Sequence, residues 1–339
     1  MLRVPVLVVP LVVAFLVPLA APTAQLVWTK ADDGRAGHAL AVFPGTGRVL
    51  LFGGAGSSGF LPDTWEWRGT AWSAHAPERT PPPRRDHALA AGPGGRLVLF
   101  GGAGMNGLLA DTWEWDGTTW TQKSPPRAPG ARSGHAMVFD PTRNRVVLFG
   151  GADTTAFLGD VWEWDGATWT LAASAGPPPR RGHGLVFDAA RGVTLLFGGR
   201  GVTGLLADTW TWTGNAWSQG AVGGPPGRHA HAMAFDAARQ RTVVFGGTGS
   251  TGLRQDTWEH DGVAWSQAAP TAAPGARTGS AMAFDPASGR IVLHAGLGAN
   301  GYFADSWVWD GMAWSEPEPS NRRSGASRAG TPPTSSRSS

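Results

Sequence analysis

The residues of this chain that could do chemistry recur at a spacing of 48 or 49 positions. An Arg opens each repeat, at Arg35, Arg84, Arg132, Arg180, Arg228 and Arg277. A His follows three residues later, at His38, His87, His135, His183 and His231, with Ser280 in the sixth repeat. An Asp lies further along, at Asp63, Asp111, Asp160, Asp208, Asp256 and Asp305. Because guanidinium groups bind carboxylate and sulfate bidentately, six Arg around one opening would make a cationic ring for acidic ligands.

The same spacing permits a structural use of these residues. Equal numbers of Arg and Asp at equal periods also suit ion pairs that hold loops and neighbouring repeats together. The five His could be imagined as a metal ring, but placement around an axis spreads them apart, so we expect structural hydrogen bonds and no metal. Glu recurs at Glu66, Glu114, Glu163 and Glu259, and this repetition singles out none of them as a catalytic acid or base.

The elements that position these residues can be read from one repeat. An apolar segment at 134–140 (GHAMVFD) is followed by a polar turn and by a second apolar segment at 145–151 (RVVLFGG). An eight-residue loop then leads to 160–170 (DVWEWDGATWT), which predicts a hairpin that turns at Asp165 and Gly166. Trp169 should return opposite Trp164 as a cross-strand pair. Each repeat therefore predicts four short antiparallel strands.

Six copies of this pattern span residues 35–314. Phe-Gly-Gly closes the second strand at Phe52, Phe100, Phe149, Phe197 and Phe245, and His-Ala-Gly replaces it at His294. A strand that ends in a glycine pair, a loop and an aromatic-rich hairpin, at a period near 50, resembles the Kelch repeat. The resemblance implies an all-β, six-bladed β-propeller of four-stranded antiparallel blades, in a single domain of the galactose oxidase-like Kelch superfamily fold.

Most of the Trp residues belong to this scaffold. Of 18 Trp, 17 fall on repeat positions, so we expect them in the core rather than in a ligand platform. Trp28 stands before the first repeat and resembles a last strand of a blade. Either the Trp28 segment or the Trp314 segment could close the ring, and the sequence leaves this choice open.

The two ends of the chain differ in composition from the repeats. Residues 1–24 combine Arg3, an apolar run and small residues, which predicts a secretory signal peptide; the alternative is an uncleaved anchor. The expected domain is 25–315, and 316–339 is rich in Pro, Ser and Arg and predicts a disordered tail. The chain has no Cys, which excludes disulfides and thiolate sites. We expect a secreted, periplasmic or cell-surface protein with no stable membrane insertion after cleavage.

The loops after the glycine pairs vary most and could form a binding surface. Beside the large apolar residue of each loop stands a second one, at Leu109, Leu158, Leu206 and Phe303, with Arg254 in the fifth repeat. These residues predict an exposed collar that could bind a partner. The collar and the six repeat Arg together make up the predicted binding site. The net charge is +3 and only two residues are Lys, which disfavours nucleic acid as a partner.

The functional expectation is a binding or scaffold module without catalytic activity. Kelch-like propellers are most often interaction platforms, so the resemblance implies a monomer that binds a protein or an acidic surface glycan without a cofactor. A galactose oxidase needs a Cys cross-linked to a Tyr, and this chain has no Cys and only Tyr302. The alternative is a carbohydrate-active enzyme similar to a sialic acid mutarotase.

Overall fold

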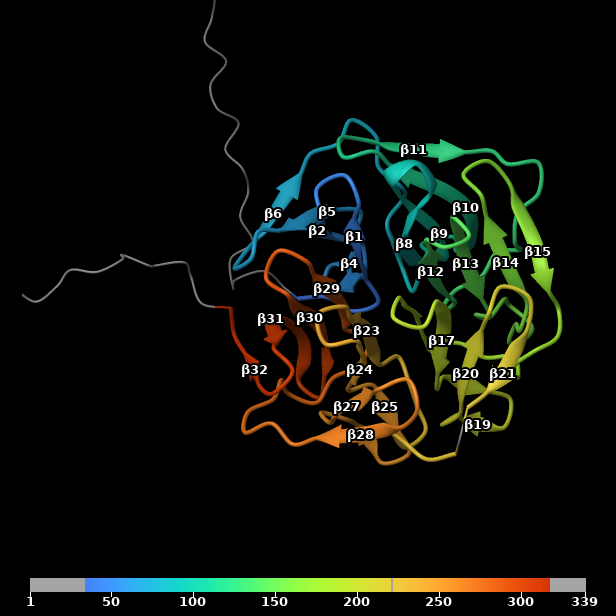
Figure 1. Cartoon of the computed structure of the whole chain (residues 1–339). Coiled ribbons are helices and arrows are strands. Elements are labelled where there is room, and N and C mark those ends of the chain that lie inside the picture. Colours follow the sequence, from blue (N-terminus) through green and yellow to red (C-terminus); the bar gives the residue numbers. More distant parts are fainter. Residues whose placement is uncertain (1–33, 221, 318–339) are drawn as a thin grey trace, which may run out of the picture.

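The computed structural model describes residues 34–220 and 222–317, and within them nearly all regular structure is β-strand (Figure 1). The main strands of each repeat unit form one antiparallel sheet, in the order in which they follow in the chain. The expected all-β fold of four-stranded antiparallel sheets is confirmed at this level. The predicted signal peptide at 1–24, Trp28 and the tail from 318 onward lie outside the described residues.

The first three units have the following strands. Unit 1 contains β1 (Ala39–Phe43), β2 (Arg48–Phe52), β5 (Thr64–Trp67) and β6 (Trp72–His75). Unit 2 contains β8 (Ala88–Gly92), β9 (Arg96–Gly104), β10 (Gly107–Trp115) and β11 (Trp120–Lys123), with β7 (Arg84–Arg85) added to β9 and a 3-10 turn at Pro93–Gly95. Unit 3 contains β12 (Ala136–Asp140), β13 (Arg145–Phe149), β14 (Val161–Trp164) and β15 (Trp169–Ala173).

The other three units repeat this order. Unit 4 contains β16 (Gly184–Asp188), β17 (Val193–Phe197), β20 (Thr209–Trp212) and β21 (Trp217–Gln219). Unit 5 contains β23 (Ala232–Asp236), β24 (Arg241–Phe245), β27 (Thr257–His260) and β28 (Trp265–Ala268). Unit 6 contains β29 (Ala281–Asp285), β30 (Arg290–Gly298), β31 (Gly301–Trp309) and β32 (Trp314–Ser315). Short loop strands complete the set: β3 (Ala55–Gly56), β4 (Gly59–Phe60), β18 (Arg200–Gly201), β19 (Gly204–Leu205), β22 (Arg228–His229), β25 (Thr248–Gly249) and β26 (Gly252–Leu253).

The second strand of each unit is the most deeply buried element. In β13, the side chains from Val146 to Phe149 have no exposed surface, because the strand is flanked by its own sheet and covered on both faces by neighbouring sheets. This explains why these strands read as continuous apolar runs rather than as alternating ones. The predicted hairpin is confirmed as well: Trp164 pairs with Trp169 across β14 and β15, and their ring centroids lie 5.4 Å apart.

The sheets pack side by side around a common centre. The first strands contact one another in the series β1, β8, β12, β16, β23 and β29, and β29 also contacts β1. In Figure 1 these strands lie near the middle, and the fourth strands, such as β6, β11 and β28, lie at the periphery. Aromatic side chains link adjacent units; for example, the Nε1 of Trp169 donates to Thr112 of the preceding unit. The arrangement is consistent with a propeller-like fold.

The described residues contain no helix that is long and apolar enough to cross a membrane.

Candidate functional site

The six repeat Arg are buried and paired with the six repeat Asp. Arg180 is typical: its Nη1 and Nη2 donate to the two carboxylate oxygens of Asp208 at 2.6 and 2.7 Å. Its Nη1 also donates to the carbonyl of Gly198, and its Nε donates to the carbonyl of Pro178. Burial alone would raise the pKa of Asp208, but hydrogen bonds from Arg180 and Trp210, and the charge of Arg180, bring it below its usual value. The other five pairs have the same bidentate geometry.

This geometry corrects the expectation of an arginine ring for acidic ligands. Arg180 has no exposed surface, and four of its five N–H groups already donate within the protein. The same side-chain burial holds for Arg35, Arg84, Arg132, Arg228 and Arg277. Arg and Asp pair and bond the loop backbone, as the structural reading of the sequence had it, but they fasten the loop that joins the second and third strands of their own unit rather than joining neighbouring units.

The repeat His are also buried, each against the second-strand Phe of the preceding unit. The His135 ring contacts that of Phe100 edge-on at 5.6 Å, and its Nε2 lies 3.1 Å from the carbonyl oxygen of Phe100. Burial, reinforced by the charge of Arg132, lowers the pKa of His135 to about 3. His38 meets His294 in place of a Phe, at 5.5 Å. Among residues 34–220 and 222–317, no group of three or more acidic or His side chains could hold a metal ion.

The predicted apolar collar is not an exposed surface. Leu109, Leu158, Leu206, Arg254 and Phe303 are all half-buried. Four of them fold back over a glycine of their own loop, so that a side chain added at Gly104, Gly201, Gly249 or Gly298 would meet Leu109, Leu206, Arg254 or Phe303. Phe303 also lies 3.9 Å beneath the guanidinium of Arg277. The loop hairpins use these side chains for their own packing. The side chains are therefore only partly exposed and do not form the exposed collar that the sequence predicted.

Six backbone hydrogen bonds link the units near the centre of the loop face. Each joins the residue that precedes the repeat His, or Ser280, to its counterpart in the preceding unit. The N–H of Gly182 donates to the carbonyl of Gly134 at 2.7 Å, and that of Gly37 in unit 1 donates to Gly279 in unit 6 at 2.9 Å. The participants are Gly37, Asp86, Gly134, Gly182, Ala230 and Gly279, all with φ between 52° and 67°. They surround a depression of about 110 Å³, here called the mouth.

Asp86 is the one acidic residue at this position of the repeat. Its φ of 54° lies in the region that usually favours glycine. Burial raises the pKa of Asp86, while the charges of Arg85 and Arg181 act in the opposite direction. The Nε of Arg85 lies 3.6 Å from its carboxylate.

The residues just before this position bring further charge to the mouth. They are Ala36, Arg85, Ser133, Arg181, His229 and Thr278, and Arg85 and Arg181 are exposed. Their guanidinium groups lie over the rings of Phe60 and Phe157 at 5.7 and 5.9 Å. Arg200 belongs to the same cluster, because its backbone exchanges two hydrogen bonds with that of Arg181, at 2.9 and 3.0 Å. Burial, and then the charges of Arg200 and Arg181, lower the pKa of His229.

Arg85, Asp86, Arg181, Arg200 and His229 form what we call the mouth cluster. Sequence reasoning missed it because these residues do not repeat. The sequence did contain a signal, which was departure from the repeat: charged residues stand at positions where most other units have a small or neutral residue. At neutral pH the cluster carries three guanidinium groups against one carboxylate, so it can attract a carboxylate or sulfate group.

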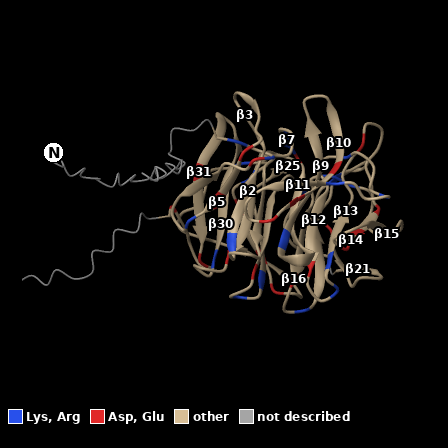
Figure 2. Cartoon of the chain, turned by 90° about the horizontal axis from the view of Figure 1, so that it is seen from above, with Lys and Arg blue, Asp and Glu red and all other residues tan. Residues whose placement is uncertain are grey.

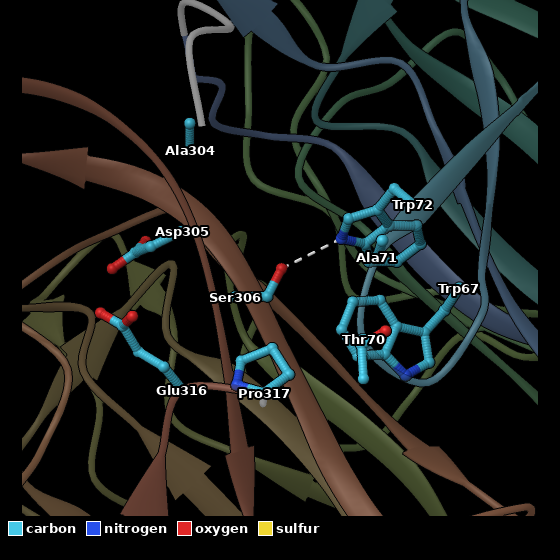
Figure 3. A pocket seen from close by; sticks show the side chains of 9 residues that line it. All are labelled: Trp67, Thr70, Ala71, Trp72, Ala304, Asp305, Ser306, Glu316 and Pro317. Atoms are coloured by element: carbon cyan, nitrogen blue, oxygen red, sulfur yellow. Dashed lines mark hydrogen bonds between the residues drawn. The ribbon is translucent and has the colours of Figure 1, made fainter. Parts of the chain in front are cut away.

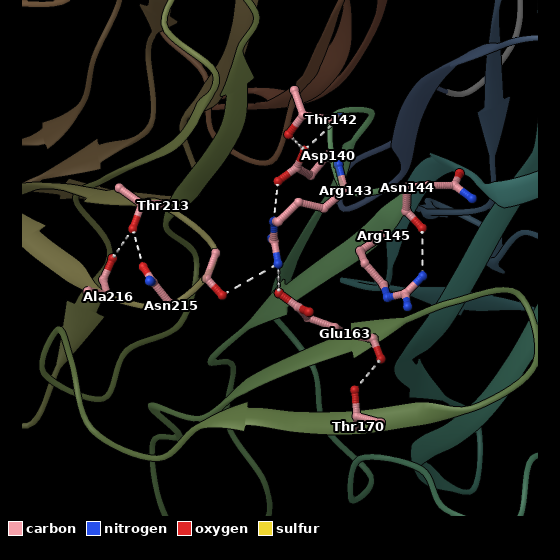
Figure 4. Close-up of polar contacts among 11 residues, drawn as sticks. Asp140, Thr142, Arg143, Asn144, Arg145, Glu163, Thr170, Thr213, Asn215 and Ala216 are labelled. Carbon is pink, nitrogen blue, oxygen red and sulfur yellow. Dashed lines mark hydrogen bonds and ion pairs between the residues drawn. The ribbon is translucent and has the colours of Figure 1, made fainter.

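Elsewhere, charged residues serve structural contacts. Figure 2 shows basic and acidic residues interspersed over the molecule. In Figure 4, Arg143 donates from Nε to Asp140 at 2.7 Å and from Nη1 to Glu163 at 2.5 Å, and it reaches the carbonyl of Gly214 in the next unit at 3.5 Å. Glu114 accepts from the Nε1 of Trp164 at 3.2 Å. These contacts give Glu163 and Glu114 structural partners.

Two other hollows differ from the mouth in their chemistry. The opposite end of the central opening encloses about 330 Å³ and is lined mainly by apolar side chains of the first strands, including Met137, Phe187 and Phe235. A smaller hollow of about 140 Å³ lies between units 1 and 6, where the Nε1 of Trp72 donates to the hydroxyl of Ser306 at 3.0 Å (Figure 3). The larger hollow has no charged residue in its lining, and the smaller one is lined by the carboxylates of Asp305 and Glu316, so neither offers the basic groups of the mouth cluster.

No family model matches the chain, and no curated protein matches it.

Proposed function

We propose that the chain is an exported, Kelch-like propeller of six blades that binds a partner and has no catalytic activity. Support for six blades comes from the six sequence repeats, each with its own sheet. Support for a closed ring comes from the contact of β29 with β1 and from the hydrogen bond between Gly37 and Gly279. The apolar run and small residues within 1–24 support export to the cell surface, the periplasm or the medium.

The proposed binding site is the mouth cluster, and the partner is an acidic glycan. The observation that carries this proposal is a local excess of positive charge: the repeat Arg are neutralised by their Asp, whereas Arg85 and Arg181 act on one carboxylate, Asp86, and Arg200 lies beside Arg181. Exposed guanidinium groups can form bidentate hydrogen bonds with a uronate carboxylate or a sulfate ester. The Phe rings beneath Arg85 and Arg181 restrict their motion, which lowers the entropic cost of binding.

Neutralising the mouth cluster should weaken binding to acidic glycans. The Arg85→Ala/Arg181→Ala double variant should lose about 10-fold to 100-fold in affinity for each guanidinium that contacts the ligand, with little change in melting temperature. The measurement is binding to an array of neutral, carboxylated and sulfated glycans at two salt concentrations.

The matched control is Arg145→Ala/Arg290→Ala, which removes the same charge from the starts of β13 and β30. This control should bind as the unaltered protein does. Equal loss in both double variants would mean non-specific attraction to a basic protein. Binding to acidic peptides but to no glycan would assign the mouth cluster to a protein partner instead.

A further inference from the structure

A hydrogen bond between neighbouring units is made at two junctions, and at the junction of units 4 and 5 both of its residues are replaced by smaller ones. The Nε1 of Trp164 donates to Glu114 of the preceding unit at 3.2 Å, and the Nε1 of Trp309 donates to Glu259 in the same way at 3.1 Å. At the corresponding positions of units 4 and 5, the chain has Thr211 in place of Glu and His260 in place of Trp. Both partners are therefore smaller at this junction than where the bond is made.

A pocket that is partly open to solvent lies beside these residues at the rim of the molecule. It measures about 280 Å³ and lies between β20 of unit 4 and β27 and β28 of unit 5. Side chains of Thr209, Thr211, His260 and Trp265 form its inner wall. The lining is completed by the turn 262–264, by Gly220 and by residues 222–224. We call this the rim pocket; its size is close to that of small-molecule sites in proteins.

The wall combines aromatic surface with hydrogen-bonding groups. The rings of His260 and Trp265 lie 4.9 Å apart and are tilted by 50°. The indole N–H of Trp265 is fixed by the hydroxyl of Thr209 at 2.9 Å. The Nδ1 of His260 accepts from the backbone N–H of Gly262 at 3.1 Å, so the neutral ring carries its proton on Nε2. The pocket thus offers a fixed aromatic surface, an imidazole donor and the Thr211 hydroxyl.

Charge restricts the class of ligand. Among the described lining side chains there is no carboxylate or guanidinium, and His260 alone is titratable; the Arg191 guanidinium lies against Gly262 but is paired with Asp188 and with the Asp261 carbonyl. Burial lowers the pKa of His260, while the adjacent Asp261 and then Asp188 raise it and Arg191 and Arg241 lower it, so the imidazole is neutral at pH 7. A charged ligand would lose its hydration there without gaining an opposite charge. The pocket therefore favours a neutral molecule that has both an apolar face and hydroxyl groups.

We propose that the rim pocket binds one neutral sugar residue, as a free monosaccharide or as part of a glycan. The apolar C–H face of a pyranose can pack on the aromatic wall, while its hydroxyls exchange hydrogen bonds with Thr211, with His260 Nε2 and with the peptide groups of the glycine-rich lining. This site is separate from the mouth cluster and does not depend on the acidic-glycan proposal.

The test measures the binding of glucose, galactose, mannose and N-acetylglucosamine to the protein by saturation-transfer NMR. At least one of these sugars should bind with a Kd on the order of 1 mM, as expected for a small ligand with few polar contacts. The Thr211→Glu/His260→Trp variant introduces the Glu and Trp found at the two junctions that make this bond, and it fills the pocket. It should abolish saturation transfer while raising the melting temperature by a few degrees, about the effect of a filled cavity.

A single substitution distinguishes the loss of a hydrogen bond to the sugar from the filling of the rim pocket. Thr211→Val removes one hydroxyl at constant shape and should weaken sugar binding by about 5-fold to 10-fold, whereas Thr170→Val, at an exposed strand position, should leave it unchanged. The proposal is overturned if no sugar in the panel binds, or if the filled variant binds sugar as well as the unaltered protein. Binding of indole or adenine in the pocket without binding of any sugar would also contradict it.

Discussion

Replacing Arg180 by Ala should lower the free energy of unfolding by about 3 to 5 kcal/mol, whereas replacing its neighbour Arg181 should lower it by less than about 0.5 kcal/mol. Arg180 has no exposed surface, and its loss leaves the Asp208 carboxylate partly buried without its cation. It also leaves the carbonyl of Gly198 without its side-chain donor. Arg181 is exposed, so its side chain can be removed at little cost. Urea unfolding at pH 7.5 measures both effects.

The adjacent pair is a matched control, because both variants lose one Arg at neighbouring positions of the loop face. Arg180→Lys should recover only part of the lost stability, since an ammonium group cannot make the bidentate contact with Asp208. If Arg180→Ala were as stable as the unaltered protein and instead abolished ligand binding, the repeat Arg would be binding residues and the structural assignment would be wrong.

Acidification from pH 7 to 5.5 should remove roughly 1 kcal/mol of stability for each buried His. Seven buried side chains contribute: His38, His87, His135, His183, His231, His260 and His294. Burial is the main cause in every case, and it lowers the pKa of His135 and His231 to about 3. The folded protein therefore binds fewer protons than the unfolded chain below the ordinary His pKa of 6.5. Stability is complete above that pH and is lost as the pH falls toward 3.

The summed loss is comparable with the whole stability of an ordinary domain, so we expect cooperative unfolding near about pH 5. Urea unfolding curves recorded from pH 7.5 downward measure it. His231→Ser copies Ser280 of the sixth unit, and it should reduce the slope near pH 5 by about 1.4 kcal/mol per pH unit. Asp111 and Asp208 act at lower pH, because their pKa values are already below 3.8. Constant stability between pH 7 and 5 would contradict the burial of the His series.

The strands could be predicted from the sequence because their determinants are local. The run from Val146 to Phe149 reads as a buried strand, and the Asp165-Gly166 turn with flanking Trp reads as a hairpin; the structure has both. The burial of Trp164 also follows from its place in the repeat. Residues within about ten positions of one another determine each of these features.

The site could not be predicted in the same way. The spacing of Arg180 in the sequence is the same whether its guanidinium binds a ligand or pairs with Asp208. Asp208 lies 28 residues further along the chain, and only the fold brings the two side chains into contact. The mouth cluster joins residues from different units, so no local pattern marks it. The rim pocket depends on Thr211 and His260 together, and their contact across two units is not visible in either repeat alone.

The hydrogen bonds at the mouth have a mechanical consequence. Five of the six bonds join units that are also connected by the chain, whereas the bond from Gly37 to Gly279 joins units 1 and 6, which lie at opposite ends of the described sequence. Only non-covalent contacts hold this junction, among them the bonds from Arg35 to Phe303 and from Trp72 to Ser306. A pulling force between the two ends of the molecule would load this junction directly, because no peptide linkage there shares the tension. Separation would begin between units 1 and 6 and expose the apolar sheet face of unit 1 that packs against unit 6, including Val49, Leu51 and Trp67.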